Sequence, residues 1–203
     1  MRRKHCEVTN QSDIERILSS TNIGRMATNG PDGYPYVTPV NFVYYQGNIY
    51  FHSSPKGEKL DNLARDPRVC FEVDIPLAYL DAGLDPERRI GKLHQLYHCV
   101  IIRGKASFVP DGPLKTAALN ALVTKHEGGS NHELVNEEMP SYKACAVIEI
   151  KPITISAKSD LAQNKTLEER LAVAQHLRNR NRPMDLETIA AMGFSAPELS
   201  SPA

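Results

Sequence analysis

The sequence predicts a mainly β fold, a closed antiparallel β-barrel with peripheral helices. Short segments rich in Val, Tyr, Phe and Thr alternate with turn clusters over the first half of the chain, as hairpin-linked strands do. The turn clusters are Asn29-Gly30-Pro31-Asp32-Gly33 and Gln46-Gly47-Asn48. Segments with helical spacing interrupt the later strands, which is typical of a barrel with helices on its outside.

The predicted elements follow from these patterns. Strands are expected over residues 23–28, 34–45, 49–53, 68–74, 97–109, 143–150 and 153–157. Helices are expected over residues 12–20, 57–65, 87–95 and 113–126. Ser12 and Glu15 have the spacing of a capping box, and Pro113 suits the first helical position. Pro35 and Pro39 must lie at a strand start, an edge or a bulge, because proline cannot donate to a ladder.

The composition changes after Lys158. Aromatic residues almost vanish, residues 165–182 are charged and helical, and Asp185 can cap a short helix that ends at Gly193. The last residues, 195–203, have the composition of a disordered tail. We therefore predict a barrel domain over residues 1–157 and a helical C-terminal extension over residues 158–203 with a disordered end.

The charge balance argues against nucleic acid or an anionic membrane as the main partner. The chain of 203 residues carries 24 basic and 24 acidic side chains, without a long run of one sign. No stretch approaches the roughly 18 apolar residues of a membrane span, and the basic start lacks the apolar core of a secretory signal. Four cysteines without a C-x-x-C pair indicate small buried side chains in a reducing compartment. We predict a cytoplasmic protein without a metal site.

The segment from Tyr50 to Lys59 has the composition of an anion site. A strand ends in Ser53 and Ser54, and Lys56 and Lys59 flank the start of the next helix. Hydroxyls, backbone N–H groups, a helix N-terminus and ammonium groups together attract a phosphate monoester. An ordinary basic loop has the same composition, so this segment alone leaves both interpretations open.

A second polar group falls on the two strands before that segment. Arg25-Met26-Ala27-Thr28 and Pro39-Val40-Asn41-Phe42 offer a guanidinium, a hydroxyl and an amide beside small apolar side chains. A flat heteroaromatic ring needs apolar faces and a few directed polar contacts at its edge. A hairpin with polar outer residues is the alternative for each of these residues taken singly.

The order and spacing of these motifs resemble the FMN-binding split-barrel superfamily that includes pyridoxamine 5′-phosphate oxidase, and in particular its nitroimidazole-resistance (Nim-type) members. The resemblance covers about residues 1–157. It is carried by residues 24–28, 33–42, 49–53, 56–63, 66–69 and 97–106.

The resemblance implies an FMN-binding split β-barrel that forms a homodimer with FMN at its interface. The residues that would line the isoalloxazine ring are Arg25, Met26, Ala27, Thr28, Val40 and Asn41. His52 and Ser53 would lie near the ribityl chain and phosphate, and Lys59 would hold the phosphate with help from Lys56 and Ser54. His52 is also the candidate catalytic residue, since its imidazole would hold a small oxidant over the ring.

These assignments predict an FMN-dependent oxidoreductase whose substrate is a small oxidant such as a nitroaromatic or a quinone. The chain has no Trp, and its tail differs from the Trp-bearing segment of the vitamin B6 oxidase, so oxidation of pyridoxamine phosphate is not expected. The alternative is a non-catalytic flavin- or haem-binding sensor of the same fold, with His52 or His98 as an axial ligand.

Weaker candidates have simpler explanations. His94 and His98 have the i, i+4 spacing of a metal-binding pair on a helix, but they lie where a strand is expected to begin. His126 and His132 flank a Gly-rich loop, and we expect both to be solvated. The arginines within residues 178–182 are expected to form a solvated helix face.

Overall fold

The computed structural model describes residues 3–195 and confirms the mainly β fold. One eight-stranded sheet has the order β3-β2-β6-β7-β8-β5-β4, and β1 pairs with β8. Over the described residues this hydrogen-bonded path runs from β3 to β4 without closing, so the sheet curls into the half-barrel of a split-barrel fold rather than the closed barrel expected.

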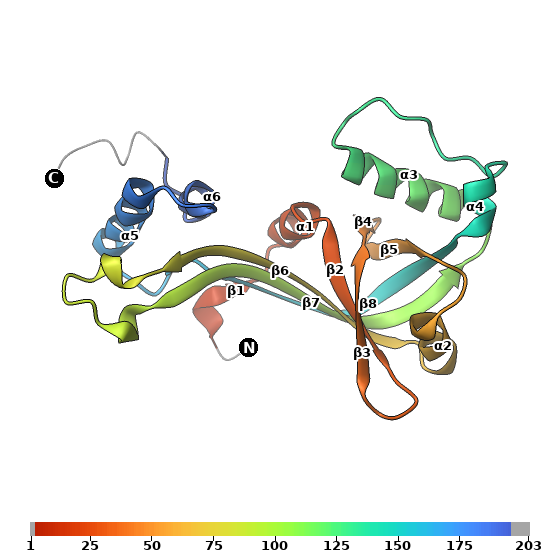
Figure 1. Ribbon diagram of the computed structural model, residues 1–203, viewed down its shortest axis with the longest axis horizontal. Coiled ribbons are helices and arrows are strands. Elements are labelled where there is room, and N and C mark those ends of the chain that lie inside the picture. The colour runs from red at the N-terminus through yellow and green to blue at the C-terminus, as the bar shows by residue number, and fades with distance from the viewer. Residues whose placement is uncertain (1–2, 196–203) are drawn as a thin grey trace. The chain divides into compact units, whose positions relative to one another are not determined.

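Figure 1 shows the elements along the chain. The strands are β1 Glu7–Val8, β2 Ile23–Asn29, β3 Pro35–Asn41, β4 Val43–Tyr45, β5 Asn48–Ser53, β6 Arg68–Leu80, β7 His94–Val109 and β8 Ala146–Asp160. The α-helices are α1 Gln11–Ser19, α2 Glu58–Arg65, α3 Pro113–Glu127, α4 Pro140–Ala144, α5 Leu167–Arg180 and α6 Asp185–Ala191. Single 3-10 turns cover Lys4–Cys6, Ala82–Leu84 and Ile90–Lys92. None of the helices in residues 3–195 has the length and apolarity needed to cross a membrane.

Several predicted elements differ from the observed ones. Asn10, not Ser12, caps α1, and its side chain accepts a hydrogen bond from the Ser12 N–H. The predicted strand 34–45 breaks at Phe42, whose side chain is fully buried. The helix expected over residues 87–95 is wrong, because Arg88 has a φ of 51°, outside helical geometry. The two strands expected within residues 143–157 form one strand, β8, over residues 146–160, since Pro152 removes only a single ladder donor, and residues 143 and 144 belong to α4.

The chain divides into two compact units, described separately below. The barrel unit comprises Asn10–Val73 and Val100–Ser156. The helical unit comprises Met1–Thr9, Asp74–Cys99 and Ala157–Ala203. The domain boundary expected near residue 157 stays a prediction. Most of the tail expected to be disordered, residues 196–203, lies outside the described residues.

The core of the barrel unit is built on aromatic contacts inside the curled sheet. Met26, Phe42, Phe51 and Phe71 are almost completely buried. The Phe42 and Phe71 rings meet edge to face with centroids 5.0 Å apart. Gly24 lies directly over the Phe71 ring, where any Cβ would clash with the ring carbons. The glycine in the strand β2 is therefore explained by this close approach.

Helix α3 covers β4 and β5 within the barrel unit (Figure 1). Leu119 and Leu122 of α3 pack in one apolar cluster with Tyr50 of β5 and Val147 of β8. His52 pairs with Val147 in the β5–β8 ladder and lies two residues beyond Tyr50, so both side chains leave the sheet on the side that α3 covers. This packing places the end of β5 next to the C-terminal half of α3.

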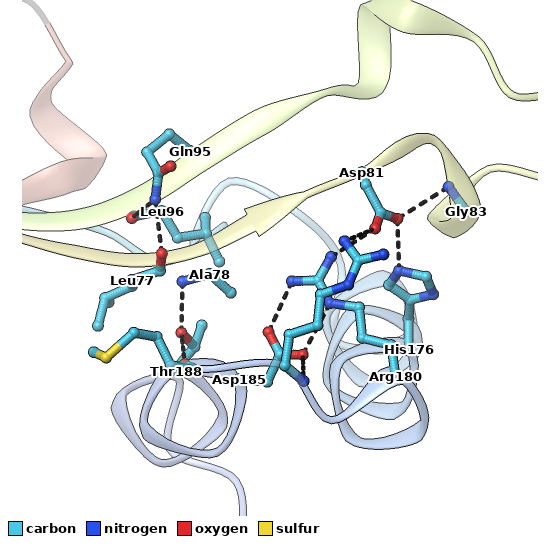
Figure 2. Close-up of polar contacts among 12 residues, drawn as sticks. Leu77, Ala78, Asp81, Gly83, Gln95, Leu96, His176, Arg180, Asp185 and Thr188 are labelled. Carbon is cyan, nitrogen blue, oxygen red and sulfur yellow. Dashed lines mark hydrogen bonds and ion pairs between the residues drawn. The ribbon is translucent and has the colours of Figure 1, made fainter.

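The helical unit is held by its own apolar core and by a network of ion pairs. Leu77 and Leu80 of β6 pack with Val173 and Leu177 of α5 and with Ile189 of α6. In Figure 2 the Arg180 guanidinium lies between two carboxylates, its Nη1 2.9 Å from Asp81 Oδ2 and its Nη2 2.7 Å from Asp185 Oδ1. The solvated helix face predicted for these arginines is therefore wrong for Arg180, whose side chain is only 12% exposed.

Candidate functional site

A cavity of about 530 Å³ in the barrel unit brings together four of the predicted site residues. They are Asn41, His52, Ser53 and Ser54. The rest of the wall comes from α3, α4 and the segment that joins them. The full lining is Asn41, His52, Ser53, Ser54, Leu119, Leu122, Val123, His126, Glu127, Val135, Ser141, Tyr142, Ala144 and Cys145. The cavity thus has a polar end at β5 and an apolar side under α3.

The end of β5 supplies the polar groups. The pleat directs His52 outward, where its side chain is exposed, and turns Ser53 inward, where 6% of the residue is exposed. The Ser53 hydroxyl oxygen is buried and has no hydrogen-bond partner among the described residues. A buried hydroxyl without a partner is costly, which makes Ser53, a lining residue of the cavity, a candidate for contact with a ligand.

The N-terminus of α2 begins four residues after Ser53. Its N-cap is Gly57, with a φ of 131°, and no side chain caps the first turn. A Cβ at Gly57 would meet no atom within 4 Å, so the space beside this residue is open. Lys59 lies in this first turn and is half-buried, while Lys56 and Ser54 are exposed. Uncapped N–H groups beside two ammonium groups fit an anion such as a phosphate.

Strands β2 and β3 divide the predicted ring-lining residues between two faces of the sheet. Met26 and Thr28 are buried inward, and Thr28 Oγ1 accepts a hydrogen bond from Asn62 of α2 at 3.1 Å. Arg25 and Ala27 face outward, and Arg25 Nη1 pairs with Glu72 at 3.2 Å. The side chains of Met26 and Thr28 thus support the fold, and a ligand on this strand would meet its outer face.

The outer face of β2 has a cavity of its own in the barrel unit. Ala27 and Thr28 line it together with Arg68, Arg103 and Ile153, and its volume is about 580 Å³. The predicted residues are therefore divided between two cavities, with Asn41, His52, Ser53 and Ser54 at the first.

The β3 strand contributes Asn41 to the first site, whereas Thr38 lies on the other face of the strand and does not line the cavity. Asn41 is exposed and lines the cavity, whereas Val40 is half-buried on the opposite face of the strand. Thr38 pairs with Met26 across the ladder, and its buried Oγ1 has no hydrogen-bond partner among the described residues.

His126 is the clearest residue that the sequence analysis missed. It lies in the last turn of α3 and lines the cavity, and its Nε2 is buried without a partner in residues 3–195. Burial lowers the pKa of the His126 imidazole, and the neighbouring Lys125 lowers it further. The expected solvation of this residue is wrong. The spacing of Leu119, Leu122, Val123 and His126 as i, i+3, i+4 and i+7 was the signal that places it on the packed face.

The two other histidines with a predicted role lie in the helical unit. His98 is buried, and its Nδ1 lies 2.7 Å from Ser159 Oγ. His94 Nε2 lies 3.1 Å from Asp160 Oδ2. Each imidazole thus has a polar neighbour that accounts for its place in the strand β7.

Comparisons with known proteins agree with this architecture. The family model described as pyridoxamine 5′-phosphate oxidase matches residues 10–159. Among curated proteins, no sequence matches the chain significantly.

Several solved structures are similar in fold, and three of them have TM-scores between 0.63 and 0.66. A putative 5-nitroimidazole antibiotic resistance protein from Bacteroides thetaiotaomicron has a TM-score of 0.63 and 21% identity, covering 75% of this chain and 85% of its own. The flavocytochrome Anf3 from Azotobacter vinelandii has a TM-score of 0.63 and 21% identity, covering 78% and 71%. The FAD and haem binding protein from Mycobacterium smegmatis has a TM-score of 0.66 and 17% identity, covering 82% and 78%. At these identities the likeness concerns the fold.

Proposed function

Because the chain belongs to the pyridoxamine 5′-phosphate oxidase family of split barrels, we propose that it binds FMN and acts as an oxidoreductase on a small oxidant such as a nitroaromatic or a quinone. The proposal includes a homodimer with FMN at its interface. The cytoplasmic location expected from the sequence remains part of this proposal.

The observation that carries the proposal is the buried Ser53 hydroxyl, which has no partner among the described residues and lies four residues before Gly57, the N-cap of α2 that no side chain caps. This hydroxyl, the backbone N–H groups at the start of α2 and the Lys59 ammonium are donors that suit the oxygens of one phosphate monoester. Lys56 and Ser54, both exposed, would complete the phosphate site. The sequence has no G-x-G-x-x-G loop of the kind that holds a pyrophosphate at a helix N-terminus, which favours a monophosphate.

The remaining assignments follow from the fit to this end of the cavity. Asn41 and the β3 backbone would meet the edge of the isoalloxazine ring, and the outer face of β2, with Arg25 and Ala27, would contribute through the dimer. When bound, FMN supplies two-electron redox chemistry, and the protein orients it and excludes water. His52, exposed at the cavity, is the residue proposed to position the oxidant.

The homodimer is supported by apolar side chains on the outer face of the β2–β3 hairpin. Ile23 is 50% exposed and Val37 is 54% exposed, and both lie on the same face as Ala27. Exposed apolar side chains gathered on one face are typical of a surface that a second copy buries.

The experiment that tests the proposal is the identification of the bound cofactor in the purified protein. We expect a flavin absorption spectrum and FMN as the released ligand in mass spectrometry. One similar structure is of an FAD and haem binding protein, so FAD or a Soret band are the outcomes that would overturn FMN. A Soret band would favour the haem-binding alternative, with His52 as the candidate ligand.

Substitution of Lys59 tests the phosphate site. Lys59→Ala should weaken FMN binding roughly ten- to a hundredfold without unfolding the protein, because a charge-assisted hydrogen bond is worth about 1.5–3 kcal/mol. Lys4→Ala is the matched control, since it removes the same charge from an exposed turn of the helical unit. Equal affinity in wild type and Lys59→Ala, measured by flavin fluorescence, would remove Lys59 from the site.

The role of His52 has a separate kinetic test. His52→Ala should retain FMN but slow the reoxidation of the reduced flavin by a nitroaromatic in stopped-flow measurements. Wild-type rates at full flavin occupancy would contradict a positioning role for His52.

A further inference from the structure

His126 offers the cavity a hydrogen-bond acceptor that the protein itself leaves unused. Its Nε2 is buried and has no partner in the described part of the chain. When the neutral ring carries its proton on Nδ1, Nε2 has a lone pair that can accept a hydrogen bond.

The surroundings keep this imidazole neutral. Burial lowers its pKa, and the nearby Lys125 and His52 act in the same direction. Glu127, the acidic neighbour in the cavity wall, is exposed, and it accepts a hydrogen bond from Ser130 Oγ at 3.0 Å. A neutral imidazole with a free lone pair accepts a hydrogen bond from a ligand that carries an O–H or N–H group.

The walls next to His126 are apolar and set the rest of the ligand chemistry. Leu119, Leu122 and Val123 line the cavity from α3, and Val135 and Tyr142 line it from the other side. Small-molecule sites of this kind combine apolar walls with a few directed polar groups, and a volume of about 530 Å³ accommodates a bicyclic aromatic molecule.

From this arrangement we propose that the apolar part of the cavity under α3 binds a neutral, flat aromatic molecule of the phenol class, whose hydroxyl donates a hydrogen bond to His126 Nε2. The binding itself does not depend on a flavin. In the enzyme, this part of the cavity would hold the hydroquinone formed when a quinone oxidant is reduced. That role rests on the proposed function.

A pair of ligands that differ only in the donor tests the proposal. The probes are 2-naphthol and 2-fluoronaphthalene, measured by equilibrium dialysis against the purified protein, both as isolated and saturated with FMN. We expect 2-naphthol to bind about tenfold more tightly, because 2-fluoronaphthalene leaves Nε2 buried and unpaired. Equal affinities, or no binding of either probe, would overturn the proposal.

Variants assign the effect to His126. His126→Phe keeps an aromatic ring but removes the acceptor, so the two probes should bind equally well. His126→Gln restores an acceptor oxygen and should recover part of the preference for 2-naphthol. A preference that persists in His126→Phe would overturn the assignment of the acceptor.

A matched pair of substitutions on α3 tests whether the probes bind in this cavity. Val123→Phe fills the space and should weaken both probes at least tenfold, whereas Thr124→Phe, on the exposed side of the same helix, should leave both affinities unchanged. Unchanged binding in Val123→Phe would exclude this cavity as the binding site.

The measurements with FMN-saturated protein distinguish a failure of this inference from a failure of the proposed function. Probe binding to a protein that takes up no FMN would leave the phenol site standing and overturn the proposed function. Competition between FMN and 2-naphthol would show that the flavin occupies the apolar part of the cavity, and would overturn the assignment of that part to a reaction partner.

Discussion

Asp185 of the helical unit and Ser53 of the barrel unit are both buried polar residues, but their surroundings differ completely. Asp185 is 0% exposed, and Arg180 Nη2 approaches its Oδ1 at 2.7 Å while the Arg182 N–H approaches its Oδ2 at 2.8 Å. Ser53 is 6% exposed, and its hydroxyl has no partner among residues 3–195. The same contrast holds between Thr188, which is fully paired, and Thr38 and His126, which are not.

The presence or absence of a partner within the fold separates polar groups that stabilise the protein from polar groups that can bind a ligand. A buried polar group that is paired within the fold offsets its own desolvation, and its removal is felt as lost stability. A buried polar group without a partner has a cost that a ligand can recover, and its removal is felt as lost affinity. Substitution of a residue, with stability and ligand affinity both measured, shows to which of these two kinds it belongs.

The largest effect is expected for Arg180, which joins Asp81 and Asp185 in Figure 2. Arg180→Met should lower the free energy of unfolding by about 3–5 kcal/mol, because it leaves the Asp185 charge buried without its partner. Urea unfolding followed by circular dichroism measures this change. Arg182→Met is the control, since Arg182 is 62% exposed in its pair with Asp81 and should cost less than about 1 kcal/mol. Equal costs in the two variants would contradict a stabilising role specific to Arg180.

A smaller loss of stability is expected at Thr188. Its hydroxyl accepts a hydrogen bond from the buried Ala78 N–H at 2.8 Å and donates to the Met184 carbonyl oxygen. Thr188→Val keeps the shape of the side chain but leaves the buried Ala78 N–H without an acceptor. The free energy of unfolding should therefore fall by about 1–3 kcal/mol. Thr124→Val, on the exposed surface of α3, should change it by less than about 0.5 kcal/mol. A neutral Thr188→Val would mean that water replaces the hydroxyl.

The sequence predicted the fold well because the strand and turn signals are local. Turn clusters at residues 29–33 and 46–48, and the Pro113 helix start, have mechanisms that operate within a few residues. The failures are tertiary. Phe42 leaves its predicted strand because its ring packs on Phe71, which lies 29 positions later in the chain.

The site was predictable only where its groups are close in sequence. Asn41, His52, Ser53 and Ser54 meet at one cavity, as a loop at a strand end suggests. His126 was missed because only the packing of α3 on β5 brings it beside His52. Likewise, nothing in the local pattern of residues 178–182 tells that Arg180 meets Asp81, which is 99 positions away.

Lys125 shares features of the paired and the unpaired buried polar groups, since it is charged, half-buried and partly paired. Its Nζ donates to the Leu18 carbonyl oxygen at 3.1 Å and lies 3.7 Å from the centre of the Phe42 ring. Burial lowers the pKa of this amine from 10.5 to about 8. Between these pH values the unfolded chain binds more protons than the folded one, so the free energy of unfolding should rise with pH.

The comparison with Lys125→Met isolates this effect, because all other titrating groups are common to both proteins. Between pH 8 and pH 10 the free energy of unfolding of the wild type should rise by roughly 1 kcal/mol relative to that of the variant. This is less than the full pKa shift would give, because the amine is partly exposed to solvent. Urea unfolding at several pH values measures it. A constant difference would show that the amine keeps its ordinary pKa in the folded protein.

The smallest effect on stability, and the sharpest test of the comparison, is expected at Ser53. Ser53→Ala removes a buried hydroxyl that has no partner in the described residues, so the free energy of unfolding without cofactor should change by less than about 0.5 kcal/mol. The same substitution should weaken FMN binding about tenfold, since the hydroxyl is proposed to meet the phosphate. Ser107→Ala, on an exposed position of β7, should change neither quantity. A loss of about 1–3 kcal/mol of stability with unchanged FMN affinity would place Ser53 with Thr188 among the stabilising groups. Unchanged stability together with lost affinity is the combination expected of a hydroxyl that receives a ligand, because removing it costs nothing in the free protein and removes a contact in the complex.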